Sequence, residues 1–303
     1  MGICYFKNNK KPYYLIEEEN EIKWVSEIYI DIEKSKMPFN WSISLGNNSK
    51  YDFLCGYYEL CNFPEHFEGI VLGNKKDLEI FKKIKEKYPQ IHVKALTAAE
   101  VDFLSRKHGL SYEEVVEKML EYGIDSMPGG GAEIFDEAVR RKICKGKVSS
   151  ENWLKIHRLW HEKGKQSNAT MLFGHIESKQ NRIDHMLRIR DLQDKTGGFN
   201  AFIPLVYQRD NNYLKVENYP GSAEILKTFA ISRLVLDNVA HIKAYWATST
   251  INLAMVAQEF GADDLDGTIQ KESIQSAAGA KSASGMSLRN FTDLIQTSGF
   301  VPV

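Results

Sequence analysis

The stretch that decides the fold is Ala169–Leu205, which begins A-T-M-L-F-G-H-I-E and ends L-Q-D-K-T-G-G-F-N-A-F-I-P-L. Ala169–Phe173 is short, apolar and rich in β-forming residues, so it predicts a buried strand. A helical stripe of apolar residues follows in Ser178–Lys195, and Phe199–Val206 predicts the next strand. Strand, loop, helix and strand form a βαβ unit. In such units, binding and catalytic groups gather at the carboxyl ends of the strands.

The same alternation extends over the chain from about residue 77 onward. Two capping boxes, Thr97-x-x-Glu100 and Ser111-x-x-Glu114, mark helix starts. The spacing suits right-handed crossovers, so we expect a parallel sheet and an α/β fold. The remaining predicted helices are Leu78–Tyr88, Asp136–Ile143, Glu151–Lys163, Ala223–Leu236, Ile251–Phe260 and Leu288–Thr297, and the remaining predicted strands are Ile91–Leu96, Ile124–Met127 and His241–Trp246.

The first quarter of the chain has a different character. Residues 1–76 hold 14 of the 34 aromatic residues, and turn signals interrupt their β-forming runs. We predict a small aromatic-rich α+β region there, packed as a unit distinct from residues 77–303. Ala277–Gly285, near the other end, is small and polar and predicts a mobile loop.

Composition limits the function classes. The 303 residues carry 39 basic and 40 acidic side chains, so no net charge points to nucleic acid or to an anionic membrane. No apolar run is long enough to span a bilayer, and no secretory signal pattern occurs. Four scattered cysteines are too few for a disulfide framework, so we expect a reducing cytoplasm.

The glycine run Pro128-Gly129-Gly130-Gly131-Ala132-Glu133 is the best candidate for a ligand site. Three glycines let backbone N–H groups approach a ligand closely, and the carboxylate of Glu133 can accept from an amino group or a ribose hydroxyl. An ordinary strand-to-helix turn explains the same residues equally well by spacing alone. The run is not G-x-G-x-x-G, which disfavours a dinucleotide site.

Histidines stand at two places. His175 and Glu177 follow the predicted strand Ala169–Phe173, where a histidine can act as acid, base or donor, although a histidine satisfied by a neighbouring carboxylate is the better interpretation by spacing. His157 and His161 are four residues apart on one predicted helix. The pattern H-R-L-W-H lacks the glutamate of a metalloprotease, so a structural role is favoured over zinc binding.

Two further polar groups carry weaker signals. Asp263, Asp264 and Asp266 share one loop without the alternation of a calcium-binding loop, so they indicate a solvated loop or a ribose or amine contact. Arginines that can bind carboxylates bidentately occur on helices, where most are only solvated: Arg140, Arg141 and Arg190.

Several motifs together resemble the radical S-adenosylmethionine (SAM) enzymes of the futalosine route to menaquinone. Besides the central stretch, they are D-S-M-P-G-G-G-A-E-I-F at Asp125–Phe135, L-D-N-V-A-H-I-K-A-Y-W at Leu236–Trp246 and F-G-A-D-D-L-D-G-T at Phe260–Thr268. The last two are more similar to aminodeoxyfutalosine synthases than to dehypoxanthine futalosine cyclases, which remain the alternative. The resemblance covers about residue 78 to the C-terminus and not the first quarter.

The resemblance implies a partial (β/α) TIM-like barrel of the radical SAM type. It implies a transferase in which a 5′-deoxyadenosyl radical, made by reductive cleavage of SAM, adds to the enolpyruvyl double bond of 3-[(1-carboxyvinyl)oxy]benzoate, with a reductant protein as partner. By resemblance, SAM is bound by Gly129, Gly130, Gly131, Glu133 and Arg140, and the substrate faces His175, Glu177 and Pro204.

The cysteines depart from the family pattern. The resemblance implies a [4Fe–4S] cluster on a C-x3-C-x2-C loop, and no such loop occurs in the sequence. Cys55 and Cys61 are separated by five residues and are weak candidates, whereas Cys4 and Cys144 are remote. We therefore name no metal ligands. We predict that the chain does not turn over at a meaningful rate, which keeps a catalytically inactive, truncated or rearranged chain as a further alternative.

Overall fold

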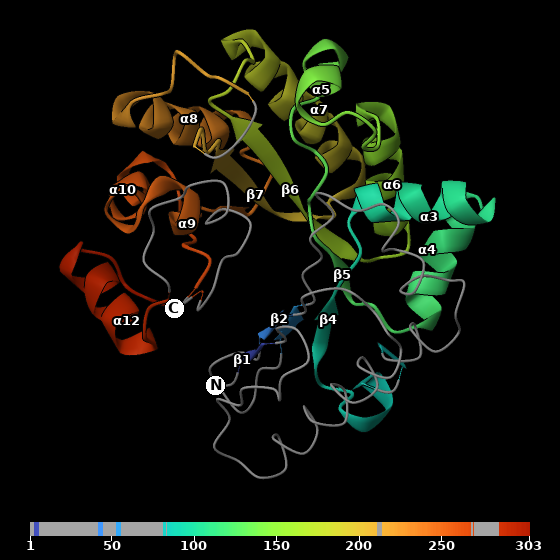
Figure 1. The fold of residues 1–303 in the computed structure, drawn as a ribbon. Coiled ribbons are helices and arrows are strands. Elements are labelled where there is room, and N and C mark those ends of the chain that lie inside the picture. Colours follow the sequence, from blue (N-terminus) through green and yellow to red (C-terminus); the bar gives the residue numbers. More distant parts are fainter. Residues whose placement is uncertain are drawn as a thin grey trace. The chain divides into compact units, whose positions relative to one another are not determined.

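The computed structural model describes residues 3–5, 42–44, 53–55, 81–82, 84–210, 214–267, 269 and 285–303. The chain divides into two compact units, Met1–Pro128 and Gly129–Val303. Figure 1 shows the elements of both units.

The first unit contains a short parallel sheet. Strand β3 (Phe53–Cys55) pairs with β4 (His92–Lys94), and β4 pairs with β5 (Ser126–Met127). Two further strands, β1 (Ile3–Tyr5) and β2 (Ser42–Ser44), form an antiparallel pair.

Two capped helices pack in the first unit, α3 (Ala98–His108) and α4 (Tyr112–Glu121). Both predicted capping boxes are present: Thr97 Oγ1 accepts from the Glu100 N–H at 3.3 Å, and Ser111 Oγ accepts from the Glu114 N–H at 3.2 Å. Each box satisfies N–H groups that the first turn of a helix otherwise leaves unpaired. The apolar faces of both helices are buried, at Val101 and Leu104 on α3 and at Val115, Val116 and Met119 on α4.

The second unit is built on the predicted βαβ pattern. Strands β6 (Gln166–Phe173), β7 (Phe199–Val206) and β8 (His241–Ile242) run parallel and in that order. Its helices are α5 (Glu137–Ile143), α6 (Ser150–Glu162), α7 (Lys179–Thr196), α8 (Ser222–Val235), α9 (Trp246–Ser249), α10 (Ile251–Ala257) with the 3₁₀ turn η2 (Gln258–Phe260), and α12 (Leu288–Thr297).

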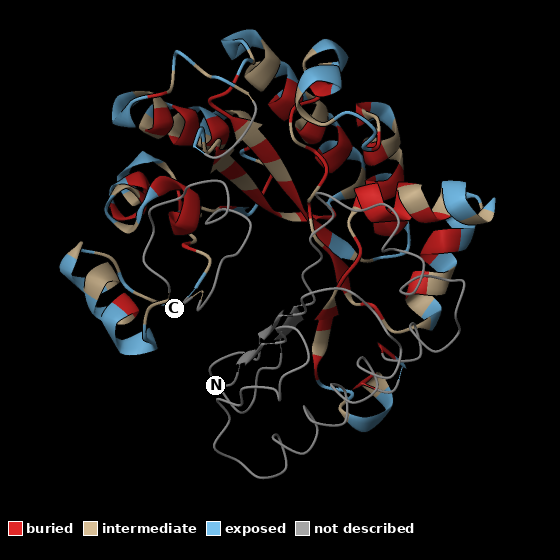
Figure 2. Ribbon diagram, in the orientation of Figure 1, coloured by how far each residue is buried: buried red, intermediate tan, exposed pale blue. Residues whose placement is uncertain are grey.

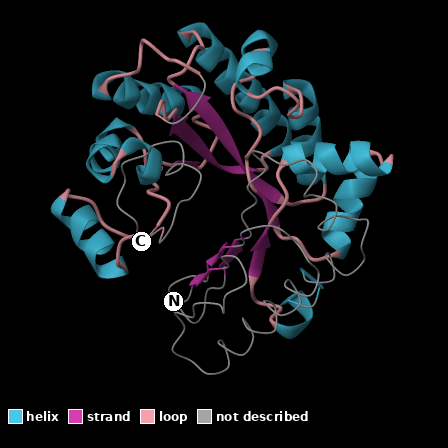
Figure 3. Cartoon of the chain, viewed as in Figure 1, coloured by secondary structure: helices cyan, strands magenta, loops and turns pink. Residues whose placement is uncertain are grey.

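The core of the second unit lies between β6 and β7 and the helices α6, α7 and α8 (Figure 2). These helices cover one side of the two strands, as Figure 3 shows. Aromatic side chains fill the interface, with Trp153 and Trp160 from α6, Phe199 and Phe202 from β7, and Phe229 from α8 all within 2% of full burial. Helices on the outside of parallel strands are the arrangement of a (β/α) barrel, which confirms the predicted fold class.

Some element boundaries differ from the prediction. The strand predicted at His241–Trp246 is only His241–Ile242, because Trp246 already begins α9. The helix predicted at Ile251–Phe260 ends as a 3₁₀ turn, and of Leu78–Tyr88 only residues 81–82 and 84–87 are described as helical. Most of residues 1–76 and of Ala277–Gly285 lie outside the described residues, so the boundary at residue 76 stays a prediction. Across the described residues, every helix is too short or too polar to cross a membrane.

Candidate functional site

The glycine loop is packed tightly against β6. A Cβ on Gly129 would stand 2.6 Å from the backbone oxygen of Asn168, so only glycine fits there. The carbonyl of Gly129 accepts from Thr170 Oγ1 at 2.8 Å, and the carbonyl of Gly130 accepts from Trp153 Nε1 at 3.1 Å. The loop is therefore fixed to the strand and to α6 by its own backbone.

Arg140 holds the glycine loop from within. Its buried guanidinium donates to the carbonyls of Gly131 at 3.0 Å and of Ile134 at 3.0 Å, and also to those of Ala132 and Val148. The Nη donors are thereby used on backbone oxygens, and Nε lies 3.8 Å from Glu137. This geometry leaves no fork for a SAM carboxylate, so the SAM contact predicted for Arg140 is not favoured.

Glu133 ends the loop in a strained conformation. Its φ is 46°, in the left-handed region that residues other than glycine seldom adopt, and such strain concentrates at functional sites. Its carbonyl accepts from the Leu172 N–H at 2.7 Å, which ties it to β6. Its side chain is 18% exposed, and Oε1 accepts from Lys147 Nζ at 2.8 Å.

The carboxyl of Glu133 is held ionised. Burial opposes ionisation, but the charges of Lys147, Arg140 and His175 together with the Lys147 hydrogen bond lower its pKa below the ordinary value. Among the described residues Oε2 has no hydrogen-bond donor. The site therefore offers an anionic oxygen to a cationic group, and SAM contact by Glu133 stays a prediction.

His175 and Glu177 form a closed network past the end of β6. Glu177 Oε1 accepts from the Gly174 N–H at 2.7 Å and from Arg182 Nε at 2.7 Å. Oε2 accepts from the His175 N–H at 2.8 Å and lies 3.0 Å from His175 Nδ1. His175 Nε2 reaches the Leu172 carbonyl at 3.0 Å.

This network keeps Glu177 charged. Burial raises the pKa of the carboxyl, but hydrogen bonds and charges from His175, Gly174 and Arg182 outweigh it and lower the pKa to about 2. Both ring nitrogens of His175 are engaged, as expected for a histidine satisfied by a neighbouring carboxylate. The third predicted substrate residue, Pro204, is buried within β7 opposite Met171. Substrate contact by these three residues stays a prediction.

His157 and His161 are joined by a hydroxyl. Ser167 Oγ lies 2.7 Å from His157 Nδ1 and 2.7 Å from His161 Nε2, and His161 Nδ1 lies 2.9 Å from Thr196 Oγ1. Burial lowers the pKa of His161 to about 4 and that of His157 well below its ordinary value. These contacts describe a neutral, structural pair.

The aspartate loop is paired with one cation from α8 and one from the residue directly after β8. Lys243 Nζ lies 3.0 Å from Asp264 and 2.8 Å from Asp266, while Arg233 Nη2 lies 2.9 Å from Asp263. The solvated-loop interpretation of these aspartates is therefore incomplete. The two ion pairs of Lys243 join the motifs Leu236–Trp246 and Phe260–Thr268, which set the synthases apart from the cyclases in the resemblance.

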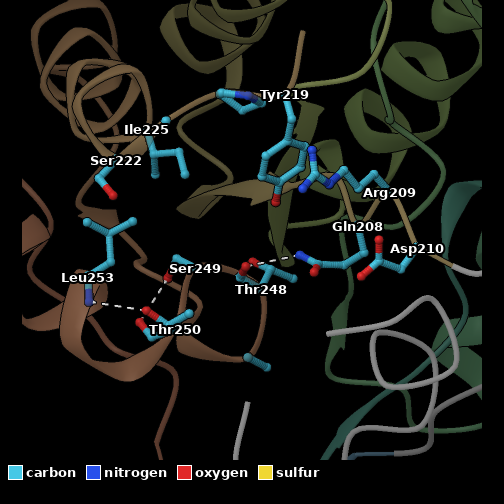
Figure 4. Close-up of a pocket in the computed structure, with 13 residues that line it drawn as sticks. Gln208, Arg209, Asp210, Tyr219, Ser222, Ile225, Thr248, Ser249, Thr250 and Leu253 are labelled. Atoms are coloured by element: carbon cyan, nitrogen blue, oxygen red, sulfur yellow. Dashed lines mark hydrogen bonds between the residues drawn. The ribbon is translucent and has the colours of Figure 1, made fainter. Parts of the chain in front are cut away.

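The sequence did not point to a cavity of about 350 Å³ that follows β7 and β8 (Figure 4). It lies among the residues directly after β7, the start of α8 and the segment Ala247–Leu253. Arg209 and Tyr219 line it, and neither belongs to a recognised motif. The available signal was the place of Arg209, just past the end of a predicted strand.

Comparisons with known proteins agree with this geometry. The family described as the radical SAM superfamily matches residues 68–189, and the family described as the CofH/MqnC C-terminal region matches residues 196–303. A 5-amino-6-(D-ribitylamino)uracil–L-tyrosine 4-hydroxyphenyl transferase of Methanococcoides burtonii is 34% identical over 258 residues, which are 82% of this chain and 71% of that protein.

The chain belongs to the radical SAM superfamily. It is 48% identical over 230 residues to the aminodeoxyfutalosine synthase of Thermus thermophilus, which are 75% of this chain and 62% of that protein. It is 41% identical over 224 residues to the cyclic dehypoxanthine futalosine synthase of Streptomyces coelicolor, covering 74% of this chain and 56% of that protein. The chain thus spans about three fifths of the length of these relatives.

The fold agrees with this family. The structure of methylornithine synthase matches with a TM-score of 0.60 at 14% sequence identity, over 98% of this chain and 76% of that one. A likeness at this low identity bears on fold alone, and it confirms the partial barrel of the radical SAM type.

The cluster that the superfamily uses does not fit the cysteines of this sequence. C-x3-C-x2-C is absent, and Cys61 lies outside the described residues, as do the side chains of Cys4 and Cys55. Cys144 is half-buried, and burial raises the pKa of its thiol, which disfavours the thiolate that binds iron. In the described part of the chain, no three histidine, cysteine or acidic side chains are grouped as metal ligands.

Proposed function

We propose that this chain is an aminodeoxyfutalosine synthase-type protein of menaquinone biosynthesis. It would keep the SAM-facing and substrate-facing parts of the barrel and lack the ligands for the cluster. The similarity to the Thermus enzyme supports the reaction class. The two synthase-like motifs meeting at Lys243 and Asp264 support the choice of synthase over cyclase.

The observation that carries SAM binding is the carboxylate of Glu133. It is anionic, held by Lys147 on one oxygen and without a donor on the other among the described residues. In this proposal Glu133 Oε2 accepts from the ammonium of SAM, since charge-assisted hydrogen bonds are the strong ones. Arg140 acts as a positioning residue, because it fixes the loop that presents Glu133.

Calorimetric titration of SAM tests this assignment. Glu133→Gln should weaken binding by about tenfold, in keeping with the loss of one charge-assisted hydrogen bond. Glu151→Gln, an exposed acid in the first turn of α6, is the matched control and should bind as the wild type does. If the Glu133→Gln variant and the wild type bind SAM with equal affinity, the assignment of Glu133 to SAM binding is wrong.

We further propose that the chain as written does not make the radical. The reason is the missing cysteine triplet, since carboxylates or isolated histidines cannot replace thiolates without changing the potential of the cluster. Iron and acid-labile sulfide, measured after anaerobic reconstitution, should stay near background. Clear formation of aminodeoxyfutalosine from SAM and 3-[(1-carboxyvinyl)oxy]benzoate with a strong reductant would overturn this proposal.

The cyclase remains the second candidate, and one comparison favours keeping it. In Streptomyces coelicolor, the aminodeoxyfutalosine synthase is 40% identical to this chain and the cyclic dehypoxanthine futalosine synthase is 41% identical. Ligand binding separates the two without turnover. A synthase-type site should bind the enolpyruvyl benzoate more tightly than dehypoxanthine futalosine, and the reverse order would favour the cyclase.

A further inference from the structure

The cavity after β7 and β8 has a charged wall and an apolar wall. Figure 4 shows Gln208, Arg209, Asp210 and Tyr219 on one side and Ile225 and Leu253 on the other. Its volume of about 350 Å³ lies in the range of pockets for small organic ligands. Both adjoining strands end beside it, which is where binding groups of (β/α) barrels gather.

Arg209 is the cation of this wall, and its charge is not used. Among the described residues its guanidinium has no hydrogen-bond acceptor and no ion pair, and no ion pair joins it to the adjacent Asp210. Its one described contact is with Tyr219, whose ring centroid lies 4.9 Å from the guanidinium carbon. A guanidinium seated on a ring is held in place while its N–H groups stay available to a planar carboxylate.

Arg209 differs here from the other arginines that rest on rings in this unit. Arg182 lies over Phe173 and is committed to Glu177 and Glu224, and Arg188 lies over Phe135 and donates to the Phe135 carbonyl and to Ser150. Arg182 and Arg188 therefore combine the contact with a ring with hydrogen bonds or ion pairs to other residues of the chain. At the cavity, the guanidinium N–H groups of Arg209 have no such acceptor among the described residues.

The opposite wall suits an apolar body. Ile225 is buried, and Leu253 and Pro220 line the same cavity. Pro220 packs closely against Gly174, the residue after β6, since a Cβ on Gly174 would stand 2.7 Å from Pro220 Cγ. On the charged side, Gln208 donates to the Val206 carbonyl and to the Thr248 carbonyl, each at 3.0 Å. On both sides of the cavity, lining residues are thus held in position by contacts outside it.

Asp210 places a carboxylate on the same wall, so the cavity does not favour anions in general. A ligand must bring its negative group to Arg209 and keep its neutral part toward Ile225 and Leu253. At the start of α8, Gly221 supplies no side-chain cap, so nearby backbone N–H groups add to the positive side.

We propose that this cavity binds a small aromatic carboxylate, with the carboxylate on the guanidinium of Arg209 and the ring between Tyr219 and the apolar wall. This inference rests on the proposed function only where it identifies the bound aromatic carboxylate as the substrate. Binding itself requires neither SAM nor a cluster, so the two proposals fail separately.

Saturation-transfer NMR with benzoate as the probe tests the proposal on the full chain at neutral pH. We expect saturable binding of benzoate and weaker binding of benzamide, which has the same ring without the charge. Arg209→Ala should weaken benzoate binding by about tenfold or more, since one charge-assisted bidentate contact is lost, and should leave benzamide unchanged. Tyr219→Leu should weaken both probes, because it removes the ring seat.

Arg289→Ala is the matched control, since Arg289 is 90% exposed on α12. It should bind benzoate as the wild type does, and far-UV circular dichroism checks that each variant folds. The proposal is overturned if the wild type shows no saturable benzoate binding, or if Arg209→Ala binds benzoate with unchanged affinity. Equal binding of benzoate and benzamide by the wild type would also overturn it.

Discussion

The two ends of β6 both hold histidines, and the two groups differ in charge. At the amino end, His157 and His161 share the hydroxyl of Ser167 and are buried without a carboxylate. Past the carboxyl end, His175 lies against the ionised Glu177, which also binds Arg182. One end is a neutral hydrogen-bonded core, and the other is a network around the ionised carboxylate of Glu177 and the guanidinium of Arg182.

The difference follows the division of labour in (β/α) barrels. Groups at the amino ends of the strands serve stability, and groups at the carboxyl ends serve binding and catalysis. The arrangement also shows why spacing alone misleads. His157 and His161 have the spacing of metal ligands and form part of the packed core, whereas His175 and Glu177 form a buried ionic network past the carboxyl end of β6.

The largest expected effect is acid destabilisation of the second unit through its buried histidines. His185 is a buried residue of α7 whose Nε2 lies 2.9 Å from the Thr170 carbonyl. Burial lowers the pKa of His161 to about 4 and that of His185 to about 3, both below the ordinary value of about 6.5, so the unfolded chain binds more protons below about pH 6.5. Stability of this unit is therefore complete above that pH and is lost as pH falls. Between pH 7 and pH 5 each of the two costs about 2 kcal/mol. Glu177, with a pKa of about 2, stays ionised over that range.

Urea unfolding followed by tryptophan fluorescence at several pH values measures this loss. Glu100 in the first unit works in the opposite direction, because burial raises its pKa to about 7 and its neutral form is favoured as pH falls. The difference between the wild type and His161→Gln isolates the histidine. If both have the same pH dependence, the neutral-core interpretation is wrong.

The second effect concerns the carboxyl end. Glu177→Gln should destabilise the unit by about 3 kcal/mol, since Arg182 and His175 lose the buried charge between them. Asp184→Asn on the exposed side of α7 is the control and should stay within about 0.5 kcal/mol of the wild type. Chemical denaturation reports both, and equal stabilities would show that the network contributes little.

A third change tests the packing of the amino-end group. Gly198→Ala should cost about 2 kcal/mol, because its Cβ would stand 2.1 Å from the ring of His161 and the buried ring must move. Gly221→Ala, which meets open space, should change stability little. A thermal melt of the two variants makes the comparison, and a neutral Gly198→Ala would mean that the ring is free to shift.

The smallest effect is that of the shared hydroxyl. Ser167→Ala should cost about 1 kcal/mol, because two imidazole nitrogens lose their common partner in the core. Ser178→Ala is the comparison variant, because it removes an exposed hydroxyl that caps α7 and not a buried one that binds two histidines. Unchanged unfolding of Ser167→Ala would indicate that water replaces the hydroxyl.

Local signals in the sequence were sufficient for much of the fold. Thr97 with Glu100 and Ser111 with Glu114 gave the starts of α3 and α4, because a capping box involves only residues three positions apart. The strand β7 was predicted at its observed bounds, since its apolar run is continuous. The end of β8 was missed because Trp246, a good strand former, is buried in a helical turn instead.

The candidate site was harder to predict, since its partners are far apart in sequence. The sequence alone does not show that the guanidinium of Arg140 donates to the glycine loop. It also does not show that Arg209 lies over the ring of Tyr219 with its N–H groups available to a ligand. Glu133 was found because it follows three glycines. Its pairing with Lys147 depends on how the segment after α5 folds back.

The bonds of Arg140 bear on the order in which the barrel folds. All four carbonyls that it binds lie within nine residues of it along the chain. Contacts of such short sequence separation close early, because little chain entropy is lost in forming them. The turn that presents Glu133 can therefore be assembled before β6 and β7 pair. Pulse-labelling hydrogen exchange during refolding would then protect the first turns of this segment ahead of the sheet.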